Sequence, residues 1–260
     1  MAKYEGTQAI SRAFQLLKMF DDEHPEWALA DLVEASAFKK TTAFRMLSAL
    51  EYEGVLQRSE SGDYQLGSEL IVLGGRAMRS NRVRSVAQPH LKQLARQTTE
   101  STTLDVLWMD EDKLPKSMVI DEVLGQHLLG MTQYVGVRFP AHTTSTGKVL
   151  LAWQPPALLE EILPETLPRK TERTIVSAEI LLTQLTQIRQ RGFAMAMHEL
   201  EMGVMATAAP IFDQHGDIQA AISVGGPSSR ISPQKLEQYG RFAAQTANAI
   251  STQLGYREAP

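Results

Sequence analysis

The stretch from Ala28 to Gly67 constrains this chain most, because it combines two short helical patterns, a tight turn and a hairpin pattern. Apolar residues recur at helical spacing on either side of a break at 35–37, first Leu29, Leu32 and Val33, then Ala43, Met46, Leu47 and Leu50. After Gly54, residues 55–58 and 64–66 read as two strands across a polar, glycine-bearing tip. This order of elements predicts a winged helix-turn-helix.

A supporting helix is expected before this stretch. It is marked by the apolar residues Ile10, Ala13, Phe14 and Leu17. The pattern ends near the acidic, proline-containing segment 21–25.

The second helix of the pair leaves one face exposed. At about 100° per residue, this face carries Thr41, Arg45 and Ser48, and two lysines lie at the amino end beside the positive pole of the helix dipole. Hydroxyl groups, cations and a helix amino terminus suit the phosphate-lined major groove of duplex DNA. The residues expected to contact DNA are Lys39, Lys40, Thr41, Thr42, Arg45 and Ser48. Small helix-turn-helix units also dock proteins, and this alternative stays open.

Composition narrows the class of protein. The 260 residues, 43% of them hydrophobic, suffice for two modest cores, and no apolar run is long enough to span a membrane. No secretory signal is visible, and the absence of cysteine excludes disulfides, thiolate catalysis and cysteine-ligated zinc. We expect a cytoplasmic protein without a membrane partner. A net charge of −4 argues against indiscriminate coating of nucleic acid, but not against a specific binder.

A connecting helix is expected after the hairpin. One of its sides is lined by Leu66, Leu70 and Leu73, and four arginines follow, Arg76, Arg79, Arg82 and Arg84. These arginines are either solvated or in contact with phosphates beside the recognition site. Pro89 is expected to mark the entry to the second domain, since it lacks a donor and disfavours helix at Gln88.

The second domain alternates helical and strand patterns. Helices are expected at 91–98, 147–153, 157–163 and 178–191, and strands at 102–108, 117–120, 204–212 and 218–224. A last helix starts after Ser232-Pro233, a capping serine followed by proline as the first helical residue. Its apolar stripe is Leu236, Tyr239, Ala243, Ala247, Ile250 and Leu254. The pattern predicts an α+β fold, an antiparallel sheet with helices on its faces.

Several motifs, taken in order, resemble the IclR-type transcriptional regulators along nearly the whole chain. They are FKKTTAFRMLSAL at 38–50, EGV at 53–55, YQLG at 64–67, GVRFPAH at 136–142, TGKVLLA at 146–152, RGF at 191–193, ELEMG at 199–203, AAPI at 208–211 and SVGGP at 223–227. The chain departs from the family at Lys39, because many relatives have proline at the start of the recognition helix.

The resemblance implies a sequence-specific transcriptional regulator that binds double-stranded operator DNA and responds to a small-molecule effector. We expect a winged helix-turn-helix domain at 1–68, a connecting helix at 69–84 and a GAF-like domain for effector binding and oligomerisation at 85–260. The assembly expected is a homodimer or a dimer of dimers. In related sensors the pocket is formed by positions that match Leu128, Met131, Phe139, Ser145, Thr146, Ala196, Val204, Ala206, Ser223 and Gly225. The apolar members would also suit an ordinary core, and hydroxyls before a helix are often only caps.

The effector is expected to be mainly apolar or aromatic. Relatives that sense small carboxylates tend to place polar side chains at the positions of Ala196 and Gly225, which have none here. No arginine or lysine is assigned to the pocket, so burial of a carboxylate there would be costly.

An enzymatic role has weaker support. Thr146-Gly147-Lys148 is no P-loop, which needs glycine at His142 and serine or threonine at Val149. The residues considered for a metal or acid-base site, His142, His198, Glu199 and Glu201, lack the common ligand spacings. Glu199 is instead expected to hold a loop by accepting backbone donors near Gly203. We expect no catalytic residue, metal or cofactor. The alternative is a metabolite-binding enzyme fused to a protein-docking helix-turn-helix.

Overall fold

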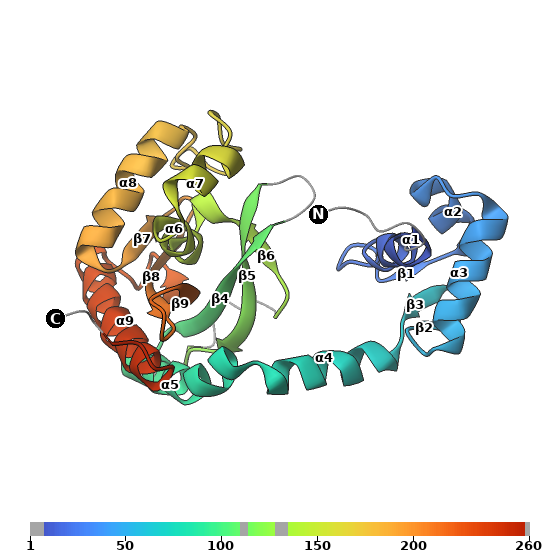
Figure 1. Ribbon diagram of the computed structural model, residues 1–260, viewed down its shortest axis with the longest axis horizontal. Helices are drawn as coiled ribbons and strands as arrows, with labels where there is room; N and C mark the ends of the chain where they lie inside the picture. The colour runs from blue at the N-terminus through green and yellow to red at the C-terminus, as the bar shows by residue number, and fades with distance from the viewer. Residues whose placement is uncertain (1–7, 110–113, 128–134, 258–260) are drawn as a thin grey trace. The chain divides into compact units, whose positions relative to one another are not determined.

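A computed structural model of the chain describes residues 8–109, 114–127 and 135–257. The chain divides into two compact units, one that ends at Ser80 and one that begins at Asn81 (Figure 1). Each unit buries hydrophobic residues of its own and is described by itself.

The amino-terminal unit is a winged helix-turn-helix. Leu32 and Leu47, one from each helix of the pair, are buried together with Leu56 and Tyr64 of the hairpin. The apolar faces expected of the two helices therefore meet in one core. The elements are α1 (Gln8–Leu17), β1 (Glu26–Trp27), α2 (Leu29–Ser36), α3 (Lys40–Tyr52), β2 (Leu56–Arg58), β3 (Tyr64–Leu66) and α4 (Ser68–Ser80).

A third strand, which the sequence did not indicate, joins the hairpin. β1 pairs antiparallel with β3, with Trp27 opposite Tyr64, so the strand order is β1-β3-β2. Trp27 Nε1 donates to the carbonyl oxygen of Met19 at 3.0 Å and ties the strand to the segment after α1. Two residues are too few for a period of two to be visible in the sequence.

The inward face of α1 differs from the expectation. Leu16 is fully buried and Phe20 lies in the same cluster, whereas Ile10 and Phe14 are 62% and 58% exposed. Leu16 and Phe20 are four residues apart, so Phe20, just beyond the helix end, lies on the same apolar side of the chain as Leu16. The helix therefore turns Leu16 inward and leaves Ile10 and Phe14 outside.

The carboxy-terminal unit has the expected α+β fold, built on one antiparallel sheet of order β6-β5-β4-β9-β8-β7. Its helices are α5 (Arg82–Thr98), α6 (Ser145–Ala152), α7 (Pro156–Ile162), α8 (Ala178–Arg191) and α9 (Pro233–Gln253), with a short 3-10 turn η1 (Ala141–Thr143). Its strands are β4 (Ser101–Met109), β5 (Pro115–Val123), β6 (Arg138–Pro140), β7 (Ala194–Met197), β8 (Val204–Phe212) and β9 (Ile218–Pro227). The two short edge strands, β6 and β7, were not expected.

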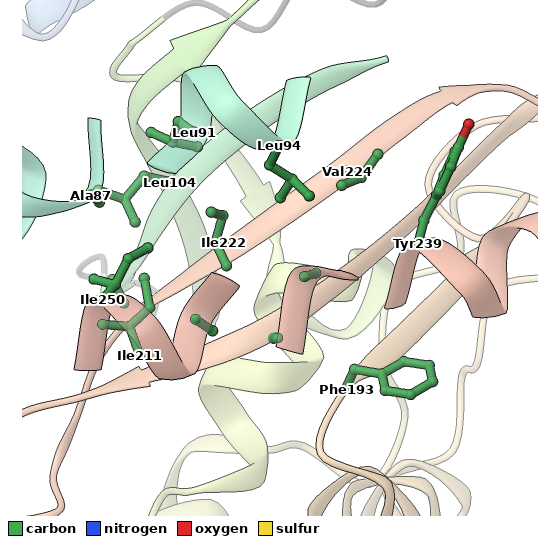
Figure 2. Close-up of a cluster of buried hydrophobic side chains, with 14 of the residues drawn as sticks. Ala87, Leu91, Leu94, Leu104, Phe193, Ile211, Ile222, Val224, Tyr239 and Ile250 are labelled. Atoms are coloured by element: carbon green, nitrogen blue, oxygen red, sulfur yellow. The ribbon is translucent and has the colours of Figure 1, made fainter. Parts of the chain in front are cut away.

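Helices cover both faces of this sheet. Successive side chains of β9 point to opposite faces, so they pack alternately against the two sets of helices. Ile222 and Val224 lie in the core formed with α5 and α9 (Figure 2). Ala221, on the opposite face, packs in the cluster formed with α6, α7 and α8. A strand that is buried on both faces carries apolar side chains at consecutive positions, as β9 does.

The last helix confirms the predicted stripe. Ser232 Oγ accepts a hydrogen bond from Lys235 N at 3.2 Å, as its capping position predicts. The residues of the stripe, all buried, are Leu236, Tyr239, Ala243, Ala247, Ile250 and Leu254. α9 therefore lies along the sheet as one layer of the unit.

Pro89 lies inside α5, so the expected entry to the domain at this residue is wrong. The helix begins at Arg82, and the side chain of Asn81 caps it by accepting from Arg84 N at 2.9 Å. Proline removes one helical hydrogen bond. Burial of Ala87 and Leu91 on either side of Pro89 holds the helix to the sheet across that position.

Gly147 in α6 predicts a large cost for alanine at this position. A Cβ there would overlap the carbonyl oxygen and the Cα of Ala141. Both atoms are backbone, so α6 or η1 must move. We expect Gly147→Ala to lower the free energy of unfolding of the carboxy-terminal unit by roughly 1–3 kcal/mol.

Gly74→Ala is the matched control, because a Cβ at this position of α4 meets nothing within 4 Å. It should stabilise the helix by up to about 1 kcal/mol. Urea titrations of both variants and the parent measure the difference. Equal stability of Gly147→Ala and the parent would contradict the packing of α6 on η1.

Candidate functional site

The exposed face of α3 carries most of the residues expected to contact DNA. Ala43 and Leu47 are buried in the core of the amino-terminal unit. Four of the expected residues are exposed: Lys39, Lys40, Thr41 and Arg45. The other two, Thr42 and Ser48, are half-buried. The amphipathic pattern therefore orients α3 as predicted.

The amino end of α3 is open. Lys39 has an extended backbone and α3 begins at Lys40, so lysine in place of proline leaves the helix entry intact. No side chain among the described residues caps this end. The first amide groups of the helix can therefore bind an anion such as a phosphate.

Arg12 of α1 adds a cation that the sequence analysis missed. It lines a surface hollow together with Thr41, Thr42 and Arg45 of α3. Its guanidinium lies 6.0 Å from the centre of the Phe38 ring. Arg12 belongs to a different helical pattern, so only the fold brings it beside α3.

Arg84 has a structural role in the carboxy-terminal unit. Its Nη2 lies 3.2 Å from Oδ1 of Asp121, and both side chains are largely buried. The other arginines after the hairpin, Arg76, Arg79 and Arg82, are exposed. Contact with DNA phosphates stays a prediction for these three.

A cavity in the carboxy-terminal unit lies between the sheet and the segment that leads into α6. One face of β4, β7, β8 and β9 forms its floor, and the strand register gathers the residues there. Ser223 lies opposite Thr103, and Ala206 lies opposite Ala196. The lining residues are Thr103, Asp105, Phe139, Thr143, Thr144, Ser145, Thr146, Ala196, Glu199, Leu200, Val204, Ala206 and Ser223.

Most positions expected in the effector pocket line this cavity. They are Phe139, Ser145, Thr146, Ala196, Val204, Ala206 and Ser223. Gly225 is not among the described lining residues but lies opposite Ala206, where a Cβ would be 3.3 Å from the Ala206 Cβ. Leu128 and Met131 lie outside the described residues. Thr143 and Thr144, two of the hydroxyl residues before the helix, also line it, whereas Thr103, Asp105, Glu199 and Leu200 were not expected there.

Asp105 places a carboxyl group in the wall of the cavity at only 1% exposure. Thr103 Oγ1 donates to its Oδ1 at 2.6 Å, and Thr146 Oγ1 donates to its Oδ2 at 2.9 Å. The hydroxyl of Ser117 is a third donor. Burial disfavours the charged form and raises the pKa of Asp105 to about 6, and the three hydroxyl bonds act against that rise. The available signal was an acidic residue inside a predicted strand with apolar neighbours.

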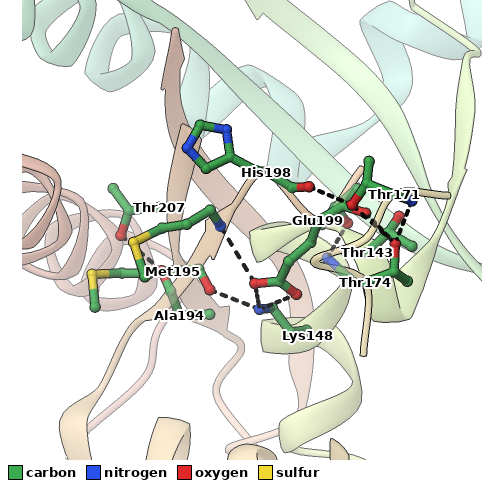
Figure 3. Close-up of polar contacts among 12 residues, drawn as sticks. Thr143, Lys148, Thr171, Thr174, Ala194, Met195, His198, Glu199 and Thr207 are labelled. Atoms are coloured by element: carbon green, nitrogen blue, oxygen red, sulfur yellow. Dashed lines mark hydrogen bonds and ion pairs between the residues drawn. The ribbon is translucent and has the colours of Figure 1, made fainter. Parts of the chain in front are cut away.

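A buried ion pair fixes the loop beside the cavity (Figure 3). Lys148 is fully buried, and its Nζ lies 2.8 Å from both carboxylate oxygens of Glu199 and 2.7 Å from the carbonyl oxygen of Met195. Burial lowers the pKa of Lys148, and the Glu199 carboxylate acts against that change. Glu199 Oε1 also accepts from Met197 N at 3.4 Å, so Glu199 holds the loop as expected, but the donor expected near Gly203 is wrong, because Gly203 N donates to His198 Nδ1 at 2.9 Å. Sequence spacing does not show that a lysine on α6 needs this distant acid.

Three of the residues considered for a metal or acid-base site, His142, His198 and Glu199, have separate partners. His142 Nε2 lies 2.8 Å from the carbonyl oxygen of Pro168, and burial lowers the pKa of His142. Glu199 is held by Lys148. Among the residues that the structure describes, no group of three or more histidine, aspartate or glutamate side chains could hold a metal ion. No helix in the same residues is long and apolar enough to cross a membrane.

Comparison with known proteins gives consistent matches along the chain. The profile of the IclR helix-turn-helix domain matches residues 9–60, and that of the bacterial transcriptional regulator IclR C-terminal domain matches residues 75–252. The HTH-type transcriptional regulator KdgR of Escherichia coli (strain K12) is 32% identical over 258 residues, which cover 98% of this chain and 96% of KdgR. The transcriptional repressor IclR of the same organism is 29% identical over 254 residues, 95% of this chain and 90% of IclR.

Solved structures agree over both units. An IclR transcriptional regulator from Alicyclobacillus acidocaldarius has a TM-score of 0.84 at 26% identity and covers 95% of this chain and 98% of its own. An IclR homolog from Microbacterium hydrocarbonoxydans, in complex with 4-hydroxybenzoate, has a TM-score of 0.82 at 26% identity, with 95% and 99% covered.

The buried carboxyl of Asp105 predicts a pH-dependent stability. The folded chain titrates this group at about 6, against 3.8 for the ordinary carboxyl, so the folded state binds its proton more tightly. Its contribution to stability is present below about pH 4 and is lost as the pH rises through about 6. Between pH 5 and pH 8 the parent should lose roughly 1–2 kcal/mol relative to Asp105→Asn.

Urea titrations of the parent and the variant at both pH values measure this loss. Other titratable groups nearby, Glu199, Lys148 and His142, are common to both chains and cancel in the comparison. Asp121→Asn is the control, because this carboxyl lies across the sheet and pairs with Arg84. The same pH profile for the parent and Asp105→Asn would show that burial of Asp105 does not perturb its titration.

Proposed function

This chain belongs to the IclR family of bacterial transcriptional regulators, and we propose how its two units divide DNA binding and effector sensing. It is a DNA-binding regulator with a carboxy-terminal effector-binding domain. In our proposal, residues 1–68 bind DNA, residues 69–84 connect the domains, and residues 85–260 bind the effector and mediate assembly. The observation that carries this proposal is the exposed, cationic face of α3 opposite its buried apolar face.

α3 is the recognition helix in this proposal. Arg45 is exposed and long enough to contact the O6 and N7 atoms of guanine in the major groove. Lys39 and Lys40 lie at the open amino end of α3, where phosphates are attracted by both charge and free amides. Lys39, Lys40, Thr41, Thr42, Arg45 and Ser48 together form the DNA-contacting set.

The effector in this proposal is a small, mainly apolar or aromatic molecule in the cavity beside α6. Ala196, Ala206 and Val204 supply apolar walls, and no arginine or lysine is among the described residues that line it. Lys148 is nearby but bound to Glu199. A relative of the same fold is known in complex with 4-hydroxybenzoate, and the aromatic ring of that molecule, though not its carboxylate, agrees with this proposal.

The effector acts by a population shift. A ligand moves an equilibrium only by its differential affinity for two states, here one arrangement of the chain that binds operator and one that does not. The sensing unit therefore needs no catalytic step, and we place its action in the cytoplasm. The relatives quoted above are named as transcriptional regulators and repressors, which disfavours an enzyme fused to a docking module.

The active form in this proposal is a homodimer or a dimer of dimers. α4 buries no residue against the described part of the chain, and Ile71, Val72 and Leu73 are 78%, 41% and 47% exposed. A second copy would cover this apolar surface, with Leu70 and Leu73 in the contact. Two winged heads would then read half-sites about 34 Å apart, or a multiple of that distance.

The role of α3 is tested by two substitutions. Arg45→Ala should weaken binding to the cognate operator by roughly 1–3 kcal/mol and relax discrimination at one base pair, because a base contact is lost. Lys40→Ala, which removes a phosphate contact, should weaken binding to cognate and random DNA alike. Titrations of both variants on both DNAs separate these effects. Cognate binding by Arg45→Ala equal to that of the parent would exclude this arginine from base recognition.

The assembly is tested by light scattering of the full chain at micromolar concentration. We expect the mass of a dimer or tetramer, and a shift towards the monomer for Leu73→Lys, because a charge would be placed in the apolar contact. A monomeric parent, both with and without operator DNA, would contradict the proposed assembly.

A further inference from the structure

The chemistry of the cavity wall points to the class of ligand that it selects. We propose that Asp105 selects small apolar or aromatic molecules that carry a hydrogen-bond donor, above all a primary amine, and rejects carboxylates. This inference rests on the proposed function, because it takes the cavity beside α6 as the effector site.

Asp105 has acceptor capacity left for a ligand. An ionised carboxylate offers about four acceptor positions. The hydroxyls of Thr103, Thr146 and Ser117 use three of them. Asp105 lines the cavity, so a bound molecule can supply the remaining donor.

The hydroxyl protons of Thr103 and Thr146 are directed towards the carboxylate of Asp105. Thr103 gives its only hydroxyl proton to Asp105, so the contact of 2.7 Å between Thr103 and Ser223 requires Ser223 to donate. Thr146 also gives its proton to Asp105. The oxygens of Ser223 and Thr146 are left with lone pairs. Asp105, Thr146 and Ser223 can therefore accept hydrogen bonds from a ligand, and with Asp105 ionised none of the three has a proton left to donate to it.

Electrostatics favours the same class of ligand. Among the described residues that line the cavity, the ionisable side chains are Asp105 and Glu199. Glu199 is neutralised by Lys148, whereas Asp105 has only hydroxyl partners in the part of the chain that the structure describes. A ligand carboxylate would lie beside a buried like charge, and an ammonium group would offset that charge.

The test uses four ligands of nearly equal size built on one benzene ring: benzylamine, benzyl alcohol, anisole and benzoate. They carry, in order, a cationic donor, a neutral donor, an acceptor without a donor, and an anion. Thermal-shift titrations of the full chain at neutral pH give a dissociation constant for each. We expect saturable stabilisation by benzylamine, weaker stabilisation by benzyl alcohol, and an affinity for benzylamine at least about tenfold above that for anisole or benzoate.

Two variants locate the effect. Asp105→Asn should bring the affinities for benzylamine and anisole to within about threefold of each other, because the charge is lost while the shape stays. Asp121→Asn, on the opposite face of the sheet and paired with Arg84, should keep the preference of the parent. The ranking measured on the parent tests the proposal even if a variant does not fold.

The outcomes distinguish a failure of the role given to Asp105 from a failure of the cavity as the effector site. Binding of anisole or benzoate as tight as that of benzylamine, or an unchanged preference in Asp105→Asn, overturns the role of Asp105 and leaves the cavity as a ligand site. No stabilisation by any of the four ligands counts against the cavity as an effector site and so against both.

Discussion

The central sheet of the carboxy-terminal unit is covered by helices on both faces, and the character of each face follows from this constraint. Side chains that meet no water must be apolar or must find a polar partner inside the unit. The face under α5 and α9 satisfies this condition with large apolar residues such as Ile222 and Val224. The face under α6 satisfies it differently, since Ala196 and Ala206 leave room there and Thr103, Asp105 and Ser223 bond to one another. The cavity and its polar wall therefore both follow from the burial of this face of the sheet under α6.

Elements whose buried apolar residues recur at regular spacing along the chain could be predicted from sequence. The stripe of α9 is long and repeats at the helical period, so its buried side was unambiguous. The short α1 allowed two overlapping stripes, and Phe20, beyond the helix end, decided between them. At Pro89 the local rule was overridden by tertiary burial, because neighbouring apolar residues hold α5 to the sheet.

The candidate sites divide in the same way. The exposed face of α3 followed from periodicity, whereas the cavity positions came from the resemblance to the family and the described ones gather largely as that resemblance implies. The charges of the cavity could not be predicted so directly. Lys148 meets Glu199 only because α6 packs on the sheet beside β7, and Asp105 meets Thr146 across a comparable sequence distance. Spacing along the chain carries no information about such pairs, since the fold alone creates them.

The exposure of α4 affects the stability of this segment as a helix. A helix of 13 residues held by its own hydrogen bonds is marginal in water, because nucleation is costly and each further turn contributes little. α4 contains Gly74 and Gly75 and has no buried residue among those described, so the chain itself supplies little to offset that cost. Its helix–coil equilibrium is then tied to whatever covers Ile71, Val72 and Leu73. Under the proposed assembly, in which a second copy covers these residues, folding and association of the segment between the two units become one event, and its stiffness varies with protein concentration.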